Sequence, residues 1–405
     1  MPRRPRTPLP PGFAALWSTV AVDLVGFGIV LPLVPIYSRR FGASPFEAAL
    51  LVAAFSGASF LAAPLWGRLS DRVGRKPVLI VSLLGTAAGS LVTALAGGLV
   101  LLYAGRVIDG LSGASVAVAQ ATATDMAGPG QRPRLFGLLG AAFGLGFVAG
   151  PAIGAVAALG GPRLPFLLAA ALAGANAVAA WRRLPESRPG GTGGGWRLNP
   201  FAGLARGRGI GGLVAVAFLA LVAFSGFEAT LPLFGQRHLG FSLSSTGAVF
   251  AAVGVGIVAV EGAVVRVLVH RWGEMVTLRV GLALNVGGLG LLAAATSWVL
   301  AAPALALLAA GQGLVQPTMA SAVAGRVDPG RRGQALGAQQ SAGGLARTIG
   351  PVAGGALLGA AASGWPYLLG AALTGAALLL AATAGGSKLL SSNIEESPLA
   401  TRQEV

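Results

Sequence analysis

The sequence predicts an all-α polytopic membrane protein with about twelve transmembrane helices in two pseudo-symmetric six-helix bundles. Three observations support this fold class. Of the 405 residues, 54% are hydrophobic and only 10% are charged, whereas a soluble domain carries about 25% charged residues. A short basic hinge at residues 67–76 separates two apolar stretches, each long enough to cross a bilayer as a helix. Two motifs also recur at one fixed spacing, which indicates that the second half of the chain repeats the first.

Hydropathy divides the apolar part of the chain into an N-terminal six-helix bundle, residues 13–181, and a C-terminal six-helix bundle, residues 211–385. Each predicted span holds about 20 residues with few charges, which is the length that a helix needs to cross the hydrocarbon. The spans lie near residues 13–37, 46–67, 77–97, 99–125, 135–159, 164–181, 211–235, 243–265, 276–295, 298–324, 334–359 and 365–385.

Three segments lie outside the two bundles. Residues 1–12 are basic and rich in proline, and we expect a cytoplasmic N-terminal segment. Residues 182–210 combine proline, glycine and arginine, which is typical of a flexible cytoplasmic linker. In residues 386–405, Ser, Asn, Ile and Glu replace Ala, Gly and Arg. We expect a disordered cytoplasmic tail there, either native or appended to the native protein.

The arginines indicate which side of the membrane is cytoplasmic. Most of them fall in loops that share one side with the basic hinge: Arg68, Arg72, Arg75, Arg132, Arg134, Arg182, Arg183, Arg188, Arg197, Arg206, Arg208, Arg266, Arg271, Arg279, Arg326, Arg331 and Arg332. The loops of the opposite side carry Arg39, Arg40, Arg163 and Arg237. Because basic residues concentrate in cytoplasmic loops, we expect a multi-pass protein of the inner (plasma) membrane with both termini cytoplasmic. The net charge of +16 is then a signal of topology rather than of nucleic-acid binding.

The repeat consists of two motifs found in the same order in both halves. Residues 26–33 and 226–233 share Gly-Phe followed by Leu-Pro-Leu, and residues 150–154 and 350–354 share Gly-Pro-x-x-Gly. Both pairs are separated by the same 200 positions. A duplicated bundle places a substrate site between the halves, near the middle of the membrane.

The basic hinge reads Gly67-Arg-Leu-Ser-Asp71-Arg72-Val-Gly74-Arg75-Lys76. This pattern resembles the loop between spans two and three of the major facilitator superfamily of transporters. The resemblance extends over nearly the whole chain, from about residue 13 to 385. It implies the major facilitator fold and alternating access, in which two bundles rock around a central site.

The hinge also contains candidate ion pairs. Asp71 lies four residues before Arg75, so the two side chains are close enough to pair if the turn is helical. Asp125, at the cytoplasmic end of span four, is a further expected partner. In the resembled family this cluster latches the cytoplasmic side together with a helix terminus of span eleven. The alternative is that these arginines only anchor the topology.

Span four carries a buried arginine. Arg106, Asp109, Gly110 and Gly113 share one helical face, and Gln120 continues it. The spacing resembles the family's Arg-x-x-x-Gly motif, which is associated with proton transfer. Two roles are open for Arg106: tuning a neighbouring carboxylate, or a structural pair with Asp109 alone.

Span five indicates the direction of transport. Its run Gly146-x-x-x-Gly150-Pro151-x-x-Gly154 lets backbones approach closely, and the proline removes one helix hydrogen bond. The run resembles the antiporter motif of drug/proton exchangers, with Ala155 in place of its last glycine. The resemblance implies export, whereas helix packing alone would explain the glycines but not the Gly-Pro placement in both halves.

Four carboxylates lie inside predicted spans, where an ionised side chain must face a cavity, pair or be protonated. Asp23 on span one and Glu228 on span seven are the leading candidates for proton coupling and for recognition of a cationic substrate. Glu261 is a candidate for a gate ion pair with Arg266, and Asp109 belongs to span four. Arg347 in span eleven is the matching cation, or else neutralises Asp23 or Glu228 permanently.

These features together resemble the twelve-span drug/proton antiporter branch of bacterial multidrug efflux proteins. The resemblance implies a proton-coupled exporter of lipophilic drug-like small molecules, including cationic ones, with the proton gradient in place of a cofactor. We expect a monomer that contacts substrate, protons and lipid, and further cavity-lining residues at Phe27, Gln120, Phe227 and Gln340. The alternative within this fold is a proton-independent facilitator or an exporter of sugars, metabolites or lipids. An enzyme is not expected, because the chain has no cysteine and only two histidines and shows no nucleophile–base or metal-ligand cluster.

Overall fold

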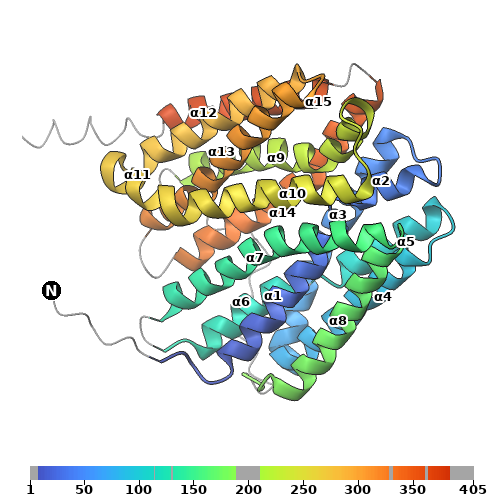
Figure 1. The fold of residues 1–405 in the computed structure, drawn as a ribbon. Helices are drawn as coiled ribbons and strands as arrows, with labels where there is room; N and C mark the ends of the chain where they lie inside the picture. Colours follow the sequence, from blue (N-terminus) through green and yellow to red (C-terminus); the bar gives the residue numbers. More distant parts are fainter. Residues whose placement is uncertain are drawn as a thin grey trace, which may run out of the picture.

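A computed structural model describes residues 8–113, 115–128, 131–187, 210–327, 332–360 and 364–383. The predicted linker and tail therefore lie largely outside the described residues. Over the described part the chain is helical throughout (Figure 1). The helices are α1 Phe13–Val30, α2 Val34–Arg39, α3 Pro45–Val73, α4 Arg75–Ala94, α5 Leu99–Leu111, α6 Ser115–Met126, α7 Arg132–Leu159, α8 Leu164–Arg183, α9 Ile210–His238, α10 Leu243–Ala259, the π-helix η1 Val260–Val264, α11 Val265–Trp272, α12 Glu274–Ala293, α13 Trp298–Gly325, α14 Arg332–Ala360 and α15 Trp365–Thr383.

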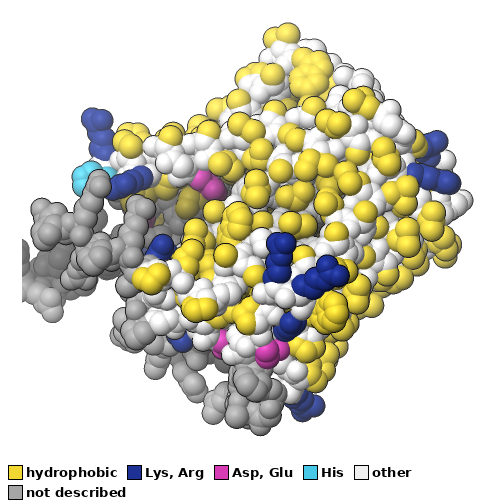
Figure 2. Space-filling model, turned by 60° about the horizontal axis from the view of Figure 1, so that its bottom comes forward, with side chains coloured by type: hydrophobic (Ala, Val, Ile, Leu, Met, Phe, Trp, Pro, Cys, Tyr) yellow, Lys and Arg dark blue, Asp and Glu magenta, His cyan; other side chains and the backbone are white. Residues whose placement is uncertain are grey.

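The predicted all-α fold is confirmed. Eleven segments of the described chain are long and apolar enough to cross a membrane, counting α1–α2, α5–α6 and α10–η1–α11 as one segment each. The one predicted span missing from these eleven is span eleven, near residues 334–359; it corresponds to α14, which is 29 residues long but more polar. Its polar residues include Gln340 and Arg347, which line a central cavity instead of facing lipid. Figure 2 shows hydrophobic side chains over most of the visible face of the molecule.

Three predicted spans are interrupted. The first ends as a helix at Val30 and resumes at Val34, because Pro32 and Pro35 lack the backbone N–H that a continuous helix needs. The fourth is broken between α5 and α6. The eighth contains η1, a single π-helical turn of the type that is frequent at functional sites.

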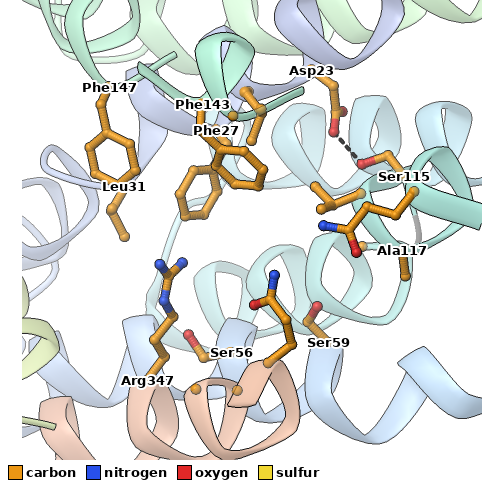
Figure 3. Close-up of a pocket in the computed structure, with 18 of the residues that line it drawn as sticks. Asp23, Phe27, Leu31, Ser56, Ser59, Ser115, Ala117, Phe143, Phe147 and Arg347 are labelled. Carbon is orange, nitrogen blue, oxygen red and sulfur yellow. Dashed lines mark hydrogen bonds between the residues drawn. The ribbon is translucent and has the colours of Figure 1, made fainter. Parts of the chain in front are cut away.

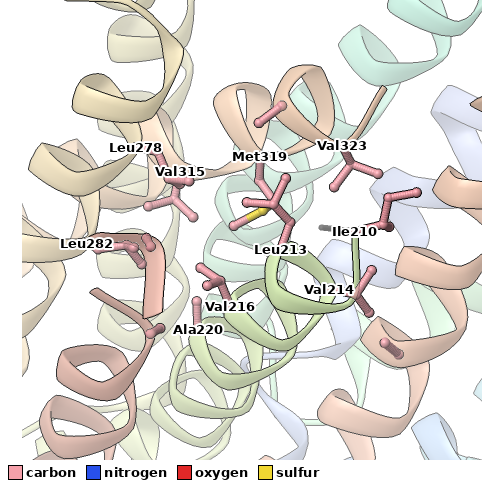
Figure 4. Packing of buried hydrophobic residues seen from close by; sticks show 14 of the residues in the cluster. Ile210, Leu213, Val214, Val216, Ala220, Leu278, Leu282, Val315, Met319 and Val323 are labelled. Atoms are coloured by element: carbon pink, nitrogen blue, oxygen red, sulfur yellow. The ribbon is translucent and has the colours of Figure 1, made fainter. Parts of the chain in front are cut away.

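The helices form two groups, α1–α8 and α9–α15, which lie in the lower and upper parts of Figure 1. In the first group α1 packs against α7 and α8, and in the second α9 packs against α14 and α15. Each group has its own buried apolar clusters; one in the second group contains Leu213, Leu278 and Met319 (Figure 4). Gly74 (φ 104°) directly precedes α4, and Gly273 (φ 82°) directly precedes α12 in the second group. Both have a positive φ, a backbone conformation that residues other than glycine rarely adopt. The internal repeat of the sequence is therefore also a repeat of packing.

Glycines of α7 form a close crossing with α1 in the first group. A Cβ added at Gly150 would lie 2.6 Å from the Cα of Gly28, and one added at Gly146 would lie 2.7 Å from the Cβ of Leu24. Gly26, the glycine of the repeated motif, has open space around it, whereas its counterpart Gly226 packs against Gly350. In the first group the glycine that contacts α7 is therefore Gly28, two positions after the glycine of the repeated motif. The close approach of α1 and α7 requires a glycine at position 28.

The two groups meet along α3–α14 and α7–α10. Both contacts include glycines that let the helices approach closely. A Cβ at Gly254 of α10 would lie 2.6 Å from the carbonyl oxygen of Phe147 in α7, and one at Gly57 of α3 would lie 3.3 Å from Thr348 in α14. Further toward the basic hinge, an added Cβ at Gly67 or Gly140 meets no atom within 4 Å. The groups therefore touch at the far end and separate toward the hinge.

Candidate functional site

A cavity of about 1570 Å³ lies between the two helix groups. Residues of α1, α3, α6, α7, α9, α13 and α14 contribute to its wall. It extends from Leu31 and Val52 to Asp71 and Arg75 of the basic hinge, and its aromatic residues come mainly from the first group. This cavity brings together most of the polar side chains that the sequence singled out.

Asp23 stands on α1 in the wall of the cavity (Figure 3). The hydroxyl of Ser115, the first residue of α6, donates a hydrogen bond of 2.5 Å to its Oδ2. The break between α5 and α6 places this serine at a helix start, where its side chain reaches α1. Asp23 is therefore half-buried, oriented by one donor and accessible from the cavity.

Arg106 and Asp109 form a buried ion pair of 2.8 Å, and the arginine is only 1% exposed. The Arg106 guanidinium lies 4.4 Å from the centre of the Phe55 ring, which in turn packs against Phe27 with ring centres 5.4 Å apart. Phe55, Phe27 and Asp109 line the cavity and Arg106 does not. The expected pair of Arg106 with Asp109 is present, and whether Arg106 also tunes a carboxylate for proton transfer stays a prediction. The ring of Phe55 lies over the arginine and keeps it from the cavity.

Glu228 of α9 and Arg347 of α14 face the cavity from the second group. Glu228 is 8% exposed and interacts electrostatically with Arg347. The three ion pairs found among the described residues do not involve Arg347. A permanent neutralisation of Asp23 or Glu228 by direct contact with Arg347 is therefore absent from the described structure.

The expected ion pair between Glu261 and Arg266 is wrong for the structure described here. Glu261 lies on η1 and lines the cavity, whereas Arg266 is exposed and does not. The two residues are five positions apart, beyond the three or four that bring side chains together on an α-helix, and Glu261 lies in the π-helical turn whereas Arg266 lies in α11.

Arg75 is the centre of the hinge. Its guanidinium contacts Asp71 at 2.8 Å, Asp125 at 2.9 Å and the hydroxyl of Ser70 at 2.6 Å, and the residue is 6% exposed. Both ion pairs expected from the sequence are present. Arg75 and Asp71 also line the cavity, at the end where the groups separate.

Glu186 is a part of the hinge that the sequence reasoning missed. Its carboxylate accepts hydrogen bonds from the backbone N–H groups of Arg75, at 2.9 Å, and Lys76, at 3.0 Å. These are the first two residues of α4, whose preceding Gly74 supplies no side-chain cap. A carboxylate at a helix N-terminus is favourable. The sequence offers two separate hints: an acidic residue in the short segment after span six, and the lack of a capping side chain before α4. Nothing in the sequence connects the two.

Three of the four further cavity residues lie where expected. Phe27, Gln120 and Gln340 line the cavity. Phe227 does not, because it is 3% exposed and packs in an apolar cluster of the second group, while Phe224, three residues earlier, faces the cavity. The cavity also holds amide side chains that the sequence reasoning did not select: Gln312, Gln316 and Gln339.

The glycines of the span-five motif do not line the cavity as a set. Gly146, Gly150 and Gly154 face α1, close to the turns that carry Asp23 and Phe27. The other face of α7 contacts α10 through Phe147, Pro151 and Ala155. Helix α7 therefore connects the helix that bears Asp23 with the opposite group.

Known proteins resemble this chain along its length. The family model described as Major Facilitator Superfamily matches residues 16–351 and 271–397. The class G tetracycline resistance protein of Vibrio anguillarum is 35% identical over 356 residues, covering 85% of this chain and 90% of the relative. The class C protein of Escherichia coli is 34% identical over 360 residues, covering 86% and 90%.

Among solved structures, the human organic anion transporter MFSD10 superimposes with a TM-score of 0.71 at 27% identity, covering 91% of this chain and 98% of the other. The nucleoside transporter NupG shares the fold with a TM-score of 0.75 at 11% identity, covering 92% and 99%. The helical repeat, the cavity between its halves and these matches together place the chain in the major facilitator superfamily, as a multi-pass membrane transporter of small molecules rather than an enzyme.

Proposed function

We propose that this protein is a proton-coupled antiporter that exports lipophilic drug-like molecules across the inner membrane. The observation that supports this function best is the cavity between the two helix groups, whose lining carboxylates include Asp23 from the first group and Glu228 from the second. Alternating access needs such a site, reached from one side at a time.

The relatives supply the first compound to test. Several proteins that resemble the chain over most of its length are named as tetracycline resistance proteins. This likeness and the glycine run of α7 favour drug export and antibiotic resistance as the biological role. Tetracycline is therefore the first substrate in the experiment below.

The proposed orientation puts the basic hinge and both termini in the cytoplasm, by the excess of arginine at that end. The cavity then opens to the cytoplasm, since the groups separate toward the hinge. In the proposed cycle Arg75, Asp71 and Asp125 form the first half of a cytoplasmic gate.

Proton coupling requires a carboxylate whose ionisation depends on whether substrate is bound. We favour Asp23 and Glu228 for this role because neither is held in an ion pair within the described residues. Asp109 is a weaker candidate, since its partner Arg106 is buried beside it. A bound cationic group beside either free carboxylate would favour its charged form and expel the proton.

The test uses purified protein in proteoliposomes with an imposed pH gradient. Internal pH is followed as tetracycline, and then a panel of lipophilic cations, is added to wild type, Asp23→Asn and Glu228→Gln. The control is Glu274→Gln, which removes a carboxylate outside the cavity. We expect substrate-dependent proton movement that one cavity variant abolishes and the control retains.

A second candidate function is a proton-independent facilitator or a metabolite exporter. Two observations favour this function: Arg347 lines the cavity and forms no ion pair within the described residues, and the chain resembles an organic anion transporter. It predicts substrate movement without proton flux in wild type, and equal transport by Asp23→Asn and Glu228→Gln. That result would contradict the antiporter proposal.

A further inference from the structure

The cavity contains a cationic side chain that has no partner among the described residues. Two of its described lining residues are cations, Arg75 and Arg347. Arg75 is occupied by Asp71 and Asp125. Neither an ion pair nor a hydrogen bond within the described chain holds the Arg347 guanidinium, and Glu228 acts on it only from beyond ion-pair distance. A charge at this depth is expensive unless it meets water or a counter-ion.

Figure 3 shows Arg347 extending from α14 into the cavity, with Phe27 and Leu31 across from it and Ser56 beside its base. The residues that follow Ser56 and Arg347 are Gly57 and Thr348, and these two pack against each other. Ser56 of α3 and Arg347 of α14 therefore lie at the same height along the two helices. Ser56 and Ser59 line the same wall, and their hydroxyls have no hydrogen-bond partner within the described residues. The Arg347 guanidinium and the two serine hydroxyls thus border the same cavity, with Ser56 beside Arg347 and Ser59 farther along the wall.

We propose that Arg347 and Ser56, with Ser59 nearby, form an anion subsite, and that the preferred ligands of this cavity carry a carboxylate, enolate or phenolate. A guanidinium offers five N–H donors in a planar fork and no acceptor, so its complement is an oxyanion rather than an amine. Apolar walls strengthen this attraction, and the positive charge of Arg347 repels a cation at the same place. The Phe27 and Phe55 rings opposite provide a face for the aromatic body of such a ligand.

The subsite also gives the ligand a direction. Asp23 lies on α1 of the first group and Arg347 on α14 of the second, so the two charges belong to opposite walls. A zwitterion with its acidic group at Arg347 and its cationic group at Asp23 would bridge both groups. This assignment rests on the proposed function, since it names the class of compound that the same cavity takes.

The experiment measures binding without transport, so its failure is distinct from a failure of export. Rhodamine B, which carries a free carboxylate, and its ethyl ester, which does not, are matched probes. Their affinities are measured by fluorescence anisotropy with purified wild type, Arg347→Gln, Arg347→Lys and Ser56→Ala in detergent. The control is Arg163→Gln, which removes one positive charge from an exposed position outside the cavity.

Wild type is expected to bind the acid more tightly than the ester. Arg347→Gln should weaken the acid by about tenfold or more, the size of a lost charged hydrogen bond, and leave the ester within about threefold. Arg347→Lys should recover part of the loss, and Ser56→Ala should weaken the acid alone by a smaller factor. A wild type without preference for the acid, including one that binds neither probe, overturns the proposal. So does an equal loss of both probes in Arg347→Gln.

Discussion

The crossing of α1 and α7 makes a quantitative prediction about Gly150. A Cβ at this position would lie 2.6 Å from the Cα and 2.7 Å from the carbonyl carbon of Gly28, and 2.7 Å from the carbonyl oxygen of Val25. All three are backbone atoms, so no side chain can rotate to make room. Gly150→Ala must therefore push two helices apart, whereas Gly140→Ala on the same helix meets no atom within 4 Å.

The magnitude follows from two opposing effects. Alanine is favoured over glycine inside a helix by about 0.5–1 kcal/mol, and both variants gain this. Overpacking costs about 1–3 kcal/mol, and only Gly150→Ala bears it. The difference in unfolding free energy between the two variants isolates the packing effect, at about 1–3 kcal/mol.

The assay is reversible unfolding by sodium dodecyl sulfate in mixed micelles, followed by tryptophan fluorescence. Gly140→Ala should be as stable as wild type or more stable, and Gly150→Ala should be the least stable of the three. Equal stability of the two alanine variants would show that α1 and α7 are not in backbone contact, and would refute the reasoning.

Three further predictions concern the ion pairs and the capped helix. Asp109→Leu leaves the Arg106 charge buried without its partner and should lower the unfolding free energy by about 3–5 kcal/mol in the same assay. The double variant with Arg106→Leu should recover part of this loss, and no recovery would argue against the pair. Glu186→Gln weakens the two hydrogen bonds to the start of α4 and should lower stability by about 0.5–1 kcal/mol, which thermal melting of the detergent-purified protein measures against wild type. Asp125→Asn removes one of the two carboxylates on Arg75, so a double-mutant cycle between these residues should give a coupling energy above about 0.5 kcal/mol; additivity would place Asp125 outside the cluster.

The sequence was sufficient for the fold and for part of the hinge, because these depend on local patterns. The span lengths and the spacing of Asp71 and Arg75 are visible in the chain itself, and both the helices and the ion pair are present. Asp125, more distant, was found because it ends a span on the same side of the membrane. The functional roles of these residues stay predictions.

Contacts between distant helices were less accessible. Glu186 caps α4 from more than a hundred residues away, and nothing in its own neighbourhood names that partner. The choice of Phe224 over Phe227, and of Gly28 over Gly26, depends on the rotation of a helix about its axis. A uniformly apolar span does not reveal that rotation, because its apolar residues are spread around the whole helix and do not mark one face as buried.

The small-residue contacts between the two helix groups bear on the speed of the cycle. Backbone meets backbone at Gly254 and Phe147, and Gly57 lies against a single threonine methyl. Long side chains at these contacts would interdigitate, and they would have to separate whenever one bundle tilted against the other. Because long side chains do not interlock at these two points, we expect the contacts there to add little to the barrier for tilting one bundle against the other.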